Sequence, residues 1–140
     1  MIKDPAILAD VRAEWEVVRR SRDRVARNLA SAMSGDGGVG QSHEFRNLAY
    51  ALCLLFAFSV LEQVLVELRD QGTFKSKKSQ LGSLMGESKD ILSWQNYELV
   101  DRGRNKRNEI AHQQAVIERA DTWLFIDAIE AELKAWQIVI

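Results

Sequence analysis

Three residues in a charged part of the chain have side chains that are suited to handling a phosphate group. Arg107, Asn108 and His112 supply a permanent cation, an amide and an imidazole that titrates near neutral pH. The first two belong to the stretch 101–109, DRGRNKRNE, which contains no large apolar side chain. A cation next to an acid–base group suits phosphate binding and proton transfer. The alternative interpretation is a solvated charged turn on a surface helix.

The geometry of a helix determines how these side chains relate to one another. At about 100° per residue, a register counted from Val100 places Gly103 and Arg107 on the side that faces the core. The guanidinium is therefore expected to be paired or to line a polar cavity. Asn108 and His112 are four residues apart and can touch. Arg107 and His112 are about 140° apart, so one helix alone does not build a complete site.

The R-N-x-x-x-H pattern of these residues resembles the R-x4-6-H signature of the HEPN superfamily, in the form where a polar residue follows the Arg. The layout of the chain is similar too, with two long helices, a shorter region that ends in the motif, a brief loop and a last amphipathic helix. The resemblance implies one HEPN-like domain over residues 1–140, an up-down four-helix bundle with an extra short helix. Gln113 and Gln114 follow His112, so the R-x4-H-x-Y form of toxins paired with a nucleotidyltransferase antitoxin is absent.

The resemblance also implies a homodimer in which the motif helices of two copies meet in a shared groove. Many HEPN proteins are metal-independent RNases, and others are non-catalytic or bind nucleotides. For an RNase, one copy of His112 would take the proton of a ribose 2′-OH and the other would donate a proton to the leaving 5′-oxygen. Arg107 would stabilise the charge on the phosphate, and Asn108 would orient His112 or the phosphate. This chemistry needs no metal and no cofactor.

The leading hypothesis is therefore a cytoplasmic endoribonuclease with a toxin, defence or stress role, whose partners are RNA, a second copy and an antitoxin or other protein. Arg102, Arg104 and Lys106 are expected to bind the phosphate backbone. The rival is a non-catalytic interaction module in which Arg107 pairs with Glu62 and the apolar second helix docks a partner. A nucleotide-binding bundle is a third reading, but the sequence contains no nucleotide motif.

Two long helices are expected before the motif. The first begins with Asp4 as N-cap and Pro5 in the first helical position, and it runs to about Met33. Its apolar stripe consists of Leu8, Val11, Trp15, Val18, Val25 and Leu29. Residues 34–40, SGDGGVG, are expected to form a loop, after which Ser42 caps the second helix.

The second helix contains residues 48–61, LAYALCLLFAFSVL, which are apolar on every side. This run is short for a membrane span, and charged residues follow it directly. We expect a central helix, covered by its own bundle on one side and by a second subunit on the other. Glu62 continues the run and is a candidate partner for Arg107 or Arg22.

The second half of the chain is expected to be helical as well. A connection at 72–79, GTFKSKKS, leads to a short turn around Leu81–Met85. The motif helix is expected over about Trp94–Gln113, with Ser93 as its cap and with Glu98 and Arg102 spaced for an ion pair. After a loop at 114–117, the last helix carries an apolar face made of Phe125, Ile126, Ile129, Leu133 and Trp136. No strand alternation appears, which favours an all-α fold.

The composition limits the remaining possibilities. A chain of 140 residues, 46% hydrophobic and 28% charged, suits one compact soluble domain. A net charge of −1 argues against a globally basic nucleic-acid binder, so any RNA contact must use local patches. The single cysteine, Cys53, allows neither a disulfide nor a thiolate metal site. The amino terminus lacks the features of a signal peptide, which favours the cytoplasm.

Two further groups of residues have alternative readings. The basic segment made of Arg19, Arg20, Arg22, Arg24 and Arg27 is either a solvated face with Arg22 paired to a core carboxylate, or a surface for an RNA backbone or a partner. The four tryptophans are expected in the core or at an interface rather than stacked on bases. They are Trp15, Trp94, Trp123 and Trp136.

Overall fold

A computed structural model describes the backbone of residues 1–33, 39–113 and 116–140, and the side chains of 1–27, 47–113 and 116–140. Within these residues the regular structure consists of helices, which confirms the all-α prediction. The helices are α1 (Pro5–Met33), α2 (Val39–Asp70), α3 (Leu81–Ser88), α4 (Tyr97–Gln113) and α5 (Arg119–Ala135).

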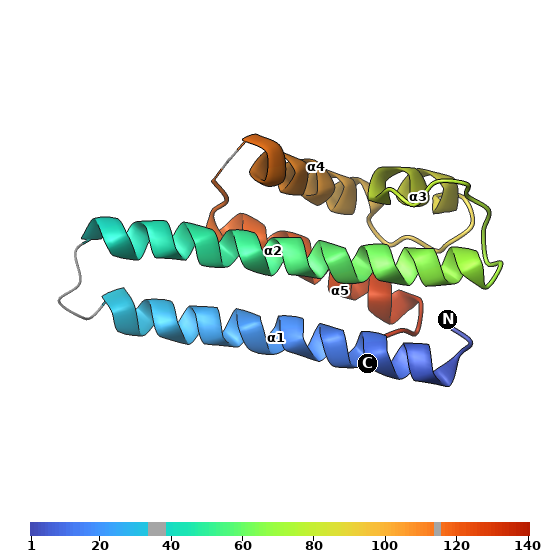
Figure 1. Ribbon diagram of the computed structural model, residues 1–140, viewed down its shortest axis with the longest axis horizontal. Helices are drawn as coiled ribbons and strands as arrows, with labels where there is room; N and C mark the ends of the chain where they lie inside the picture. The colour runs from blue at the N-terminus through green and yellow to red at the C-terminus, as the bar shows by residue number, and fades with distance from the viewer. Residues whose placement is uncertain (34–38, 114–115) are drawn as a thin grey trace.

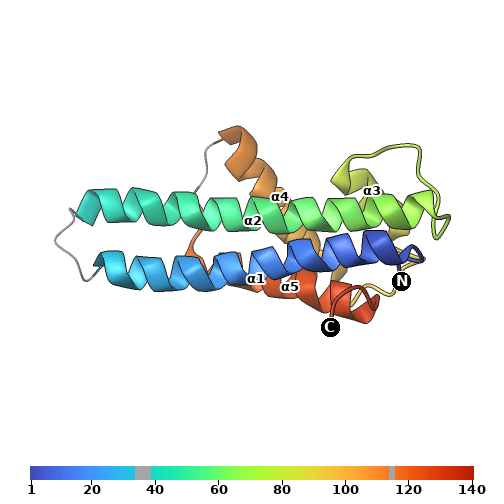
Figure 2. The same ribbon diagram turned by 60° about the horizontal axis from the view of Figure 1, so that its bottom comes forward.

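Helix α2 is the centre of the bundle and packs against each of the other helices. The four long helices α1, α2, α4 and α5 alternate in direction along the chain (Figure 1). Short helix α3 lies beside the C-terminal end of α2, and the C-terminal end of α4 projects away from α2 (Figures 1 and 2). The beginning of the motif helix thus packs against the bundle, and its C-terminal end is exposed.

Helix α1 begins as the sequence predicts. The Asp4 carboxylate accepts hydrogen bonds from the backbone N–H groups of Ala6 and Ile7, at 2.9 and 3.4 Å. Pro5 occupies the first helical position, where a missing N–H costs nothing. Of the predicted apolar stripe, the fully buried members are Val11, Trp15 and Val18. The side chain of Leu29 lies outside the described residues.

The start of α2 differs from the prediction. The helix begins at Val39, so Val39 and Gly40 belong to α2 and not to a loop. Ser42 lies within the helix, and its prediction as N-cap is wrong. A helix that is already held by a long apolar run extends at little cost, because propagation is easier than nucleation. The other residues of the predicted loop, 34–38, lie outside the described residues.

The apolar run of α2 forms the core, as expected. Its fully buried side chains include Leu54, Phe58, Leu61 and Leu65. By length and composition, Asn47–Asp70 could cross a membrane, but more than half of an 18-residue apolar window in that segment is buried inside the bundle. Such a segment is also what the central helix of a helical bundle requires, so length and composition alone are weak evidence for a membrane span.

The motif helix begins later than predicted. It starts at Tyr97, and Asn96 is its N-cap, because the Asn96 side-chain oxygen accepts the N–H of Leu99 at 3.2 Å. The prediction of Ser93 as the cap is wrong. Glu98 pairs with Lys89 at 3.4 Å, in place of the ion pair expected with Arg102.

A buried carboxylate explains the later start. Glu132 of α5 is fully buried and accepts the backbone N–H groups of Gln95 and Asn96, at 2.9 and 3.4 Å. These bonds hold the residues before α4 in a non-helical conformation. Burial raises the pKa of Glu132, and the two backbone hydrogen bonds oppose this shift. The carboxylate therefore fixes where the motif helix begins.

Gly103 allows α4 to pack closely on the core. A Cβ atom at this position would lie 2.9 Å from the rings of both Phe58 in α2 and Phe125 in α5. Any side chain would force these buried rings to move. The glycine therefore sets how near α4 lies to α2, one turn before Arg107.

The last helix and the tryptophans follow the prediction. The apolar face of α5 is buried, and the Trp136 ring that follows it lies edge-to-face with Trp94 at 4.8 Å between ring centroids. Trp15 is fully buried, and Trp123 packs partly buried against the core. All four rings therefore serve packing in this chain.

Candidate functional site

A polar pocket of about 620 Å³ lies between the start of α3 and the second half of α4. Its lining residues are Gln80, Leu81, Gly82, Ser83, Arg104, Arg107, Asn108 and His112. All three residues of the predicted motif line this one pocket, together with Arg104.

The change in burial along α4 positions these side chains. Val100 and Gly103 are buried, Arg107 is half-buried, and His112 is exposed near the end of the helix. As predicted, Arg107 lies on the side that faces the core. His112 lies where α4 has left the bundle, so its imidazole is accessible to a ligand or to another chain.

Arg107 is held by two neighbours. Its Nη2 atom lies 3.6 Å from the Glu62 carboxylate of α2, and its Nη1 donates a hydrogen bond of 3.2 Å to the Asn108 side-chain oxygen. Glu62 was a candidate partner for Arg107 or Arg22; it pairs with Arg107, whereas Arg22 pairs with Asp127. The Arg107 side chain remains 28% exposed, so it is neither isolated from solvent nor free in it.

Arg104 is held in a different way. Its Nε donates to the Asp101 carboxylate at 2.9 Å, and its side chain is 23% exposed. The guanidinium lies over Gly82 of α3: a Cβ built on Gly82 would be 3.0 Å from Nη1. Arg104 therefore spans the pocket from α4 to the start of α3.

The wall formed by α3 is also fixed in place. Arg69, near the end of α2, donates hydrogen bonds to the Lys78 carbonyl at 2.8 Å and to the Ser79 hydroxyl at 3.0 Å. Phe74 and Leu81 anchor the connection in the core. The predicted connection at 72–79 is therefore a tethered, non-helical segment that delivers Gln80 and Gly82 to the pocket.

The structure does not bring two of the predicted phosphate-binding residues into the pocket. Lys106 lies near Glu109 at 3.5 Å, and Arg102 is exposed on α4; neither lines the pocket. Each is two residues from Arg104, which is a rotation of about 200° on an α-helix, so both side chains leave α4 on the side opposite Arg104.

Sequence reasoning missed the α3 wall and Asp101. No spacing along the chain relates residues 80–83 to residues 104–112, since they meet only through the packing of two helices on α2. Asp101 did carry a signal, because it lies three residues before Arg104 and could form a helical ion pair with it.

Two arginines of the basic segment of α1, Arg19 and Arg22, form structural contacts, whereas Arg20, Arg24 and Arg27 are exposed. Arg22 pairs with Asp127 and lies over the Trp123 ring, at 4.8 Å from its centroid. Its partner is exposed, so the expectation of a core carboxylate is wrong. Arg19 pairs with Glu130 at 2.6 Å and also with Glu16.

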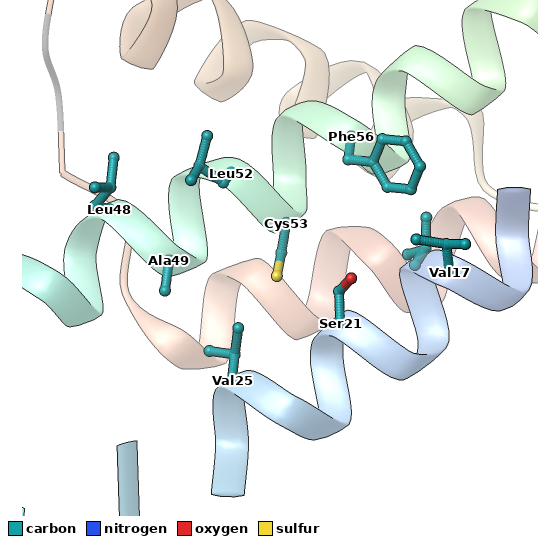
Figure 3. A pocket seen from close by; sticks show the side chains of 9 residues that line it. Val17, Ser21, Val25, Leu48, Ala49, Leu52, Cys53 and Phe56 are labelled. Carbon is teal, nitrogen blue, oxygen red and sulfur yellow. The ribbon is translucent and has the colours of Figure 1, made fainter. Parts of the chain in front are cut away.

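A second hollow, of about 470 Å³, is apolar and lies between α1 and α2 (Figure 3). Leu48 and Leu52 of α2 and Val17 of α1 lie on it and are largely exposed. Cys53 also lines it, and burial raises the pKa of the Cys53 thiol, which makes it a poor nucleophile. In the described part of the chain, no group of His, Cys, Asp and Glu side chains is arranged to hold a metal ion.

No protein-family model, curated protein or solved structure matches this chain. The assignment of a function therefore depends on the pocket and on the motif that lines it.

Proposed function

We propose that this protein is a HEPN-like, metal-independent endoribonuclease whose active site is completed by a second copy of the chain. The observation that carries the proposal is the convergence of Arg104, Arg107, Asn108 and His112 on one polar pocket. Its volume lies in the range of small-ligand sites, and its lining is cationic on the α4 side. A cytoplasmic location and a toxin, defence or stress role belong to the same proposal and rest on the motif.

The proposed reaction is cleavage by the neighbouring 2′-hydroxyl group. The 2′-oxygen attacks phosphorus, the bond from phosphorus to the 5′-oxygen breaks, and the products are a 2′,3′-cyclic phosphate and a 5′-hydroxyl. A neutral imidazole removes the 2′-proton, and a protonated imidazole gives a proton to the leaving oxygen. Arg107 stabilises the charge that grows on the phosphate, with its guanidinium oriented by Glu62 and Asn108.

One chain supplies only one His to this pocket, whereas the reaction moves two protons. His112 is exposed where α4 projects from the bundle, so a second copy can approach it there. The proposal therefore requires a dimer in which both copies of His112 border one RNA strand. Light scattering should show a dimer at the concentrations at which RNA is cut, and an active monomer would contradict the composite site.

The catalytic proposal is tested by incubating the purified protein with RNA in excess EDTA. We expect fragments with 2′,3′-cyclic phosphate ends, and no cutting by His112→Ala. The matched control is His43→Ala, since His43 is the only other histidine. Circular dichroism should show that both variants are folded. Intact RNA across many substrates, or cleavage that EDTA abolishes, would overturn the proposal.

A non-catalytic interaction module is the second candidate function. The Arg107–Glu62 pair and the apolar hollow on α1 and α2 are what this reading expects. It also expects a dry, closely packed Arg107, but this side chain is 28% exposed and lines a polar pocket. Unchanged behaviour of His112→Ala in every RNA assay would favour the module. A rise in Tm with a saturating mononucleotide, without RNA cleavage, would favour a nucleotide-binding bundle.

A further inference from the structure

Arg104 has hydrogen-bonding capacity that the fold does not use. Its Nε atom donates to Asp101. Within the described residues, its Nη1 and Nη2 atoms donate no hydrogen bond, although both carry N–H groups. The side chain is only 23% exposed and lines the polar pocket. A guanidinium that is fixed at Nε and has Nη1 and Nη2 free of protein partners within the described residues can bind an oxyanion in a bidentate manner.

Gly82 provides the space for this guanidinium. A Cβ atom at Gly82 would lie 3.0 Å from Nη1 and 3.3 Å from Cζ of Arg104. The backbone at Gly82 is ordinary helix, so conformation alone does not call for glycine there. Alanine is a better helix former than glycine. The guanidinium of Arg104 thus occupies the space next to Gly82, and a large side chain at this position would have to displace it.

Arg104 and Arg107 together present two cations to the same pocket. They are three residues apart on α4, which is about 4.5 Å along the helix axis, and both line the cavity. Each has a carboxylate on one side, Asp101 or Glu62, so both are held and neither is fully neutralised by a buried pair. Two held cations on successive turns of one helix, each with its own carboxylate, can each bind a separate phosphate of one strand.

We infer that Asp101 and Gly82 are positioning residues that hold Arg104 for the phosphate next to the one at Arg107. The substrate is then a strand with at least two consecutive phosphates, not a mononucleotide. This inference rests on the proposed function, because it takes RNA as the ligand of the pocket.

Binding of a 2′-O-methyl oligonucleotide tests the inference apart from catalysis, because a strand without a free 2′-hydroxyl cannot be cut. We expect Gly82→Leu to weaken binding about tenfold at low salt, as the leucine displaces Arg104. The slope of log affinity against log salt concentration should fall by about 0.7, the value for one phosphate contact on a single strand. Asp101→Asn should weaken binding too, although removal of a negative charge alone would strengthen it.

Gly86→Leu is the matched control. Gly86 lies one turn later in α3, and nothing lies within 4 Å of a Cβ built there. The Gly86→Leu variant carries the same substitution in the same helix but makes no contact with Arg104. Its affinity for the oligonucleotide and its salt slope should therefore equal those of the unmodified protein. Equal unfolding temperatures of the two leucine variants would show that α3 is intact in both.

A double-mutant cycle separates positioning from a structural effect. In an Arg104→Ala background, Gly82→Leu and Asp101→Asn should cause no further loss of affinity. The inference would be overturned if Gly82→Leu bound the oligonucleotide with the affinity and salt slope of the unmodified protein. It would also be overturned if Gly82→Leu and Asp101→Asn still caused their full losses of affinity in the Arg104→Ala background. Failure of the unmodified protein to bind any strand would overturn both the inference and the RNA proposal. Binding without cleavage of ordinary RNA would remove only the catalytic proposal.

Discussion

Two arginine pairs of this protein have similar surroundings but use their hydrogen-bond donors differently. Arg19 and Arg22 of α1 face α5, and Arg104 and Arg107 of α4 face α3. Both pairs have carboxylate neighbours, and both border a hollow, of about 370 Å³ at α1 and about 620 Å³ at α4. Charge and cavity alone therefore do not tell a binding site from a structural contact.

The difference lies in which N–H groups are already used. In Arg19, Nε donates to Glu130, Nη1 to Glu16 and Nη2 to the Ile140 carbonyl oxygen. The Arg19 guanidinium therefore has every nitrogen engaged. In Arg104 only Nε is engaged within the described part of the chain. A guanidinium with all three nitrogens bonded within the protein stabilises the fold, whereas one that is bonded only through Nε can take a ligand at Nη1 and Nη2.

The carboxylate partners of the two arginine pairs also differ in how many contacts they make. Glu130 accepts hydrogen bonds from the buried Trp15 indole at 2.8 Å and from Arg19. Burial disfavours its charge, but these hydrogen bonds and the charge of Arg19 together hold the pKa of Glu130 below its ordinary value of 4.5. Glu62 makes a single, longer contact of 3.6 Å with Arg107. The loose pair leaves Arg107 able to turn toward a phosphate.

The largest expected effect is the loss of RNA cleavage in Arg107→Ala. Removing one charged group that stabilises a transition state typically lowers kcat by about 10²–10³-fold. Arg22→Ala is the matched control from the α1 pair and should cut RNA at the normal rate. Single-turnover cleavage assays measure both variants. If Arg22→Ala lost activity and Arg107→Ala kept it, the distinction between the two pairs would be reversed.

A smaller effect is expected on stability from Glu130→Ala. This change leaves the buried Trp15 N–H without an acceptor and removes one of the two carboxylates that pair with Arg19, at a cost of about 1–3 kcal/mol. Asp127→Ala removes the exposed partner of Arg22 and should cost about 0–1 kcal/mol. Urea unfolding gives both values. RNA affinity should stay unchanged in both variants; an equal loss of stability would show that the Trp15 bond contributes nothing.

The smallest expected effect is on how the free energy of unfolding changes with pH. The lowered pKa of Glu130 means that its stabilising contribution is complete above pH 4.5 and is lost as the pH falls through the lower pKa of the folded state. Glu132 has the opposite sign, since its raised pKa means that its ionisation costs stability as the pH rises above 4.5.

This difference is measured by urea unfolding at a series of pH values from neutral to acid. Glu130→Ala should lose less stability than the unmodified protein as the pH falls below 4.5. Parallel curves for the two proteins would show that the Glu130 carboxylate is not held more strongly in the folded state than in the unfolded one.

The sequence predicted those parts of the fold that depend on local patterns. Asp4 and Pro5 define the start of α1, and the apolar run before Glu62 defines the core helix. The sequence-based prediction failed where a distant residue determines the structure. Hydrogen bonds to Glu132, which no local pattern contains, move the N-cap of α4 from Ser93 to Asn96.

The same limit applies to the candidate site. Arg107, Asn108 and His112 share one helix, so their spacing identified them. Gly82 lies on another helix and has no side chain to suggest a role, so only its position under Arg104 shows why it matters. Lys106 and Arg102 were included because of their charge, but the direction in which a side chain leaves the helix depends on the register.

The aromatic cluster at the base of α4 gives this molecule a built-in optical signal. The rings of Trp94 and Trp136 meet at 86°, Tyr97 packs edge-on to Trp94 at 5.1 Å, and the Trp94 indole donates to Ser88. Rings fixed in this way produce near-ultraviolet circular dichroism, which disappears when side-chain packing loosens. Any ligand that moves the start of α4 relative to these rings would therefore change this spectrum, without an added label.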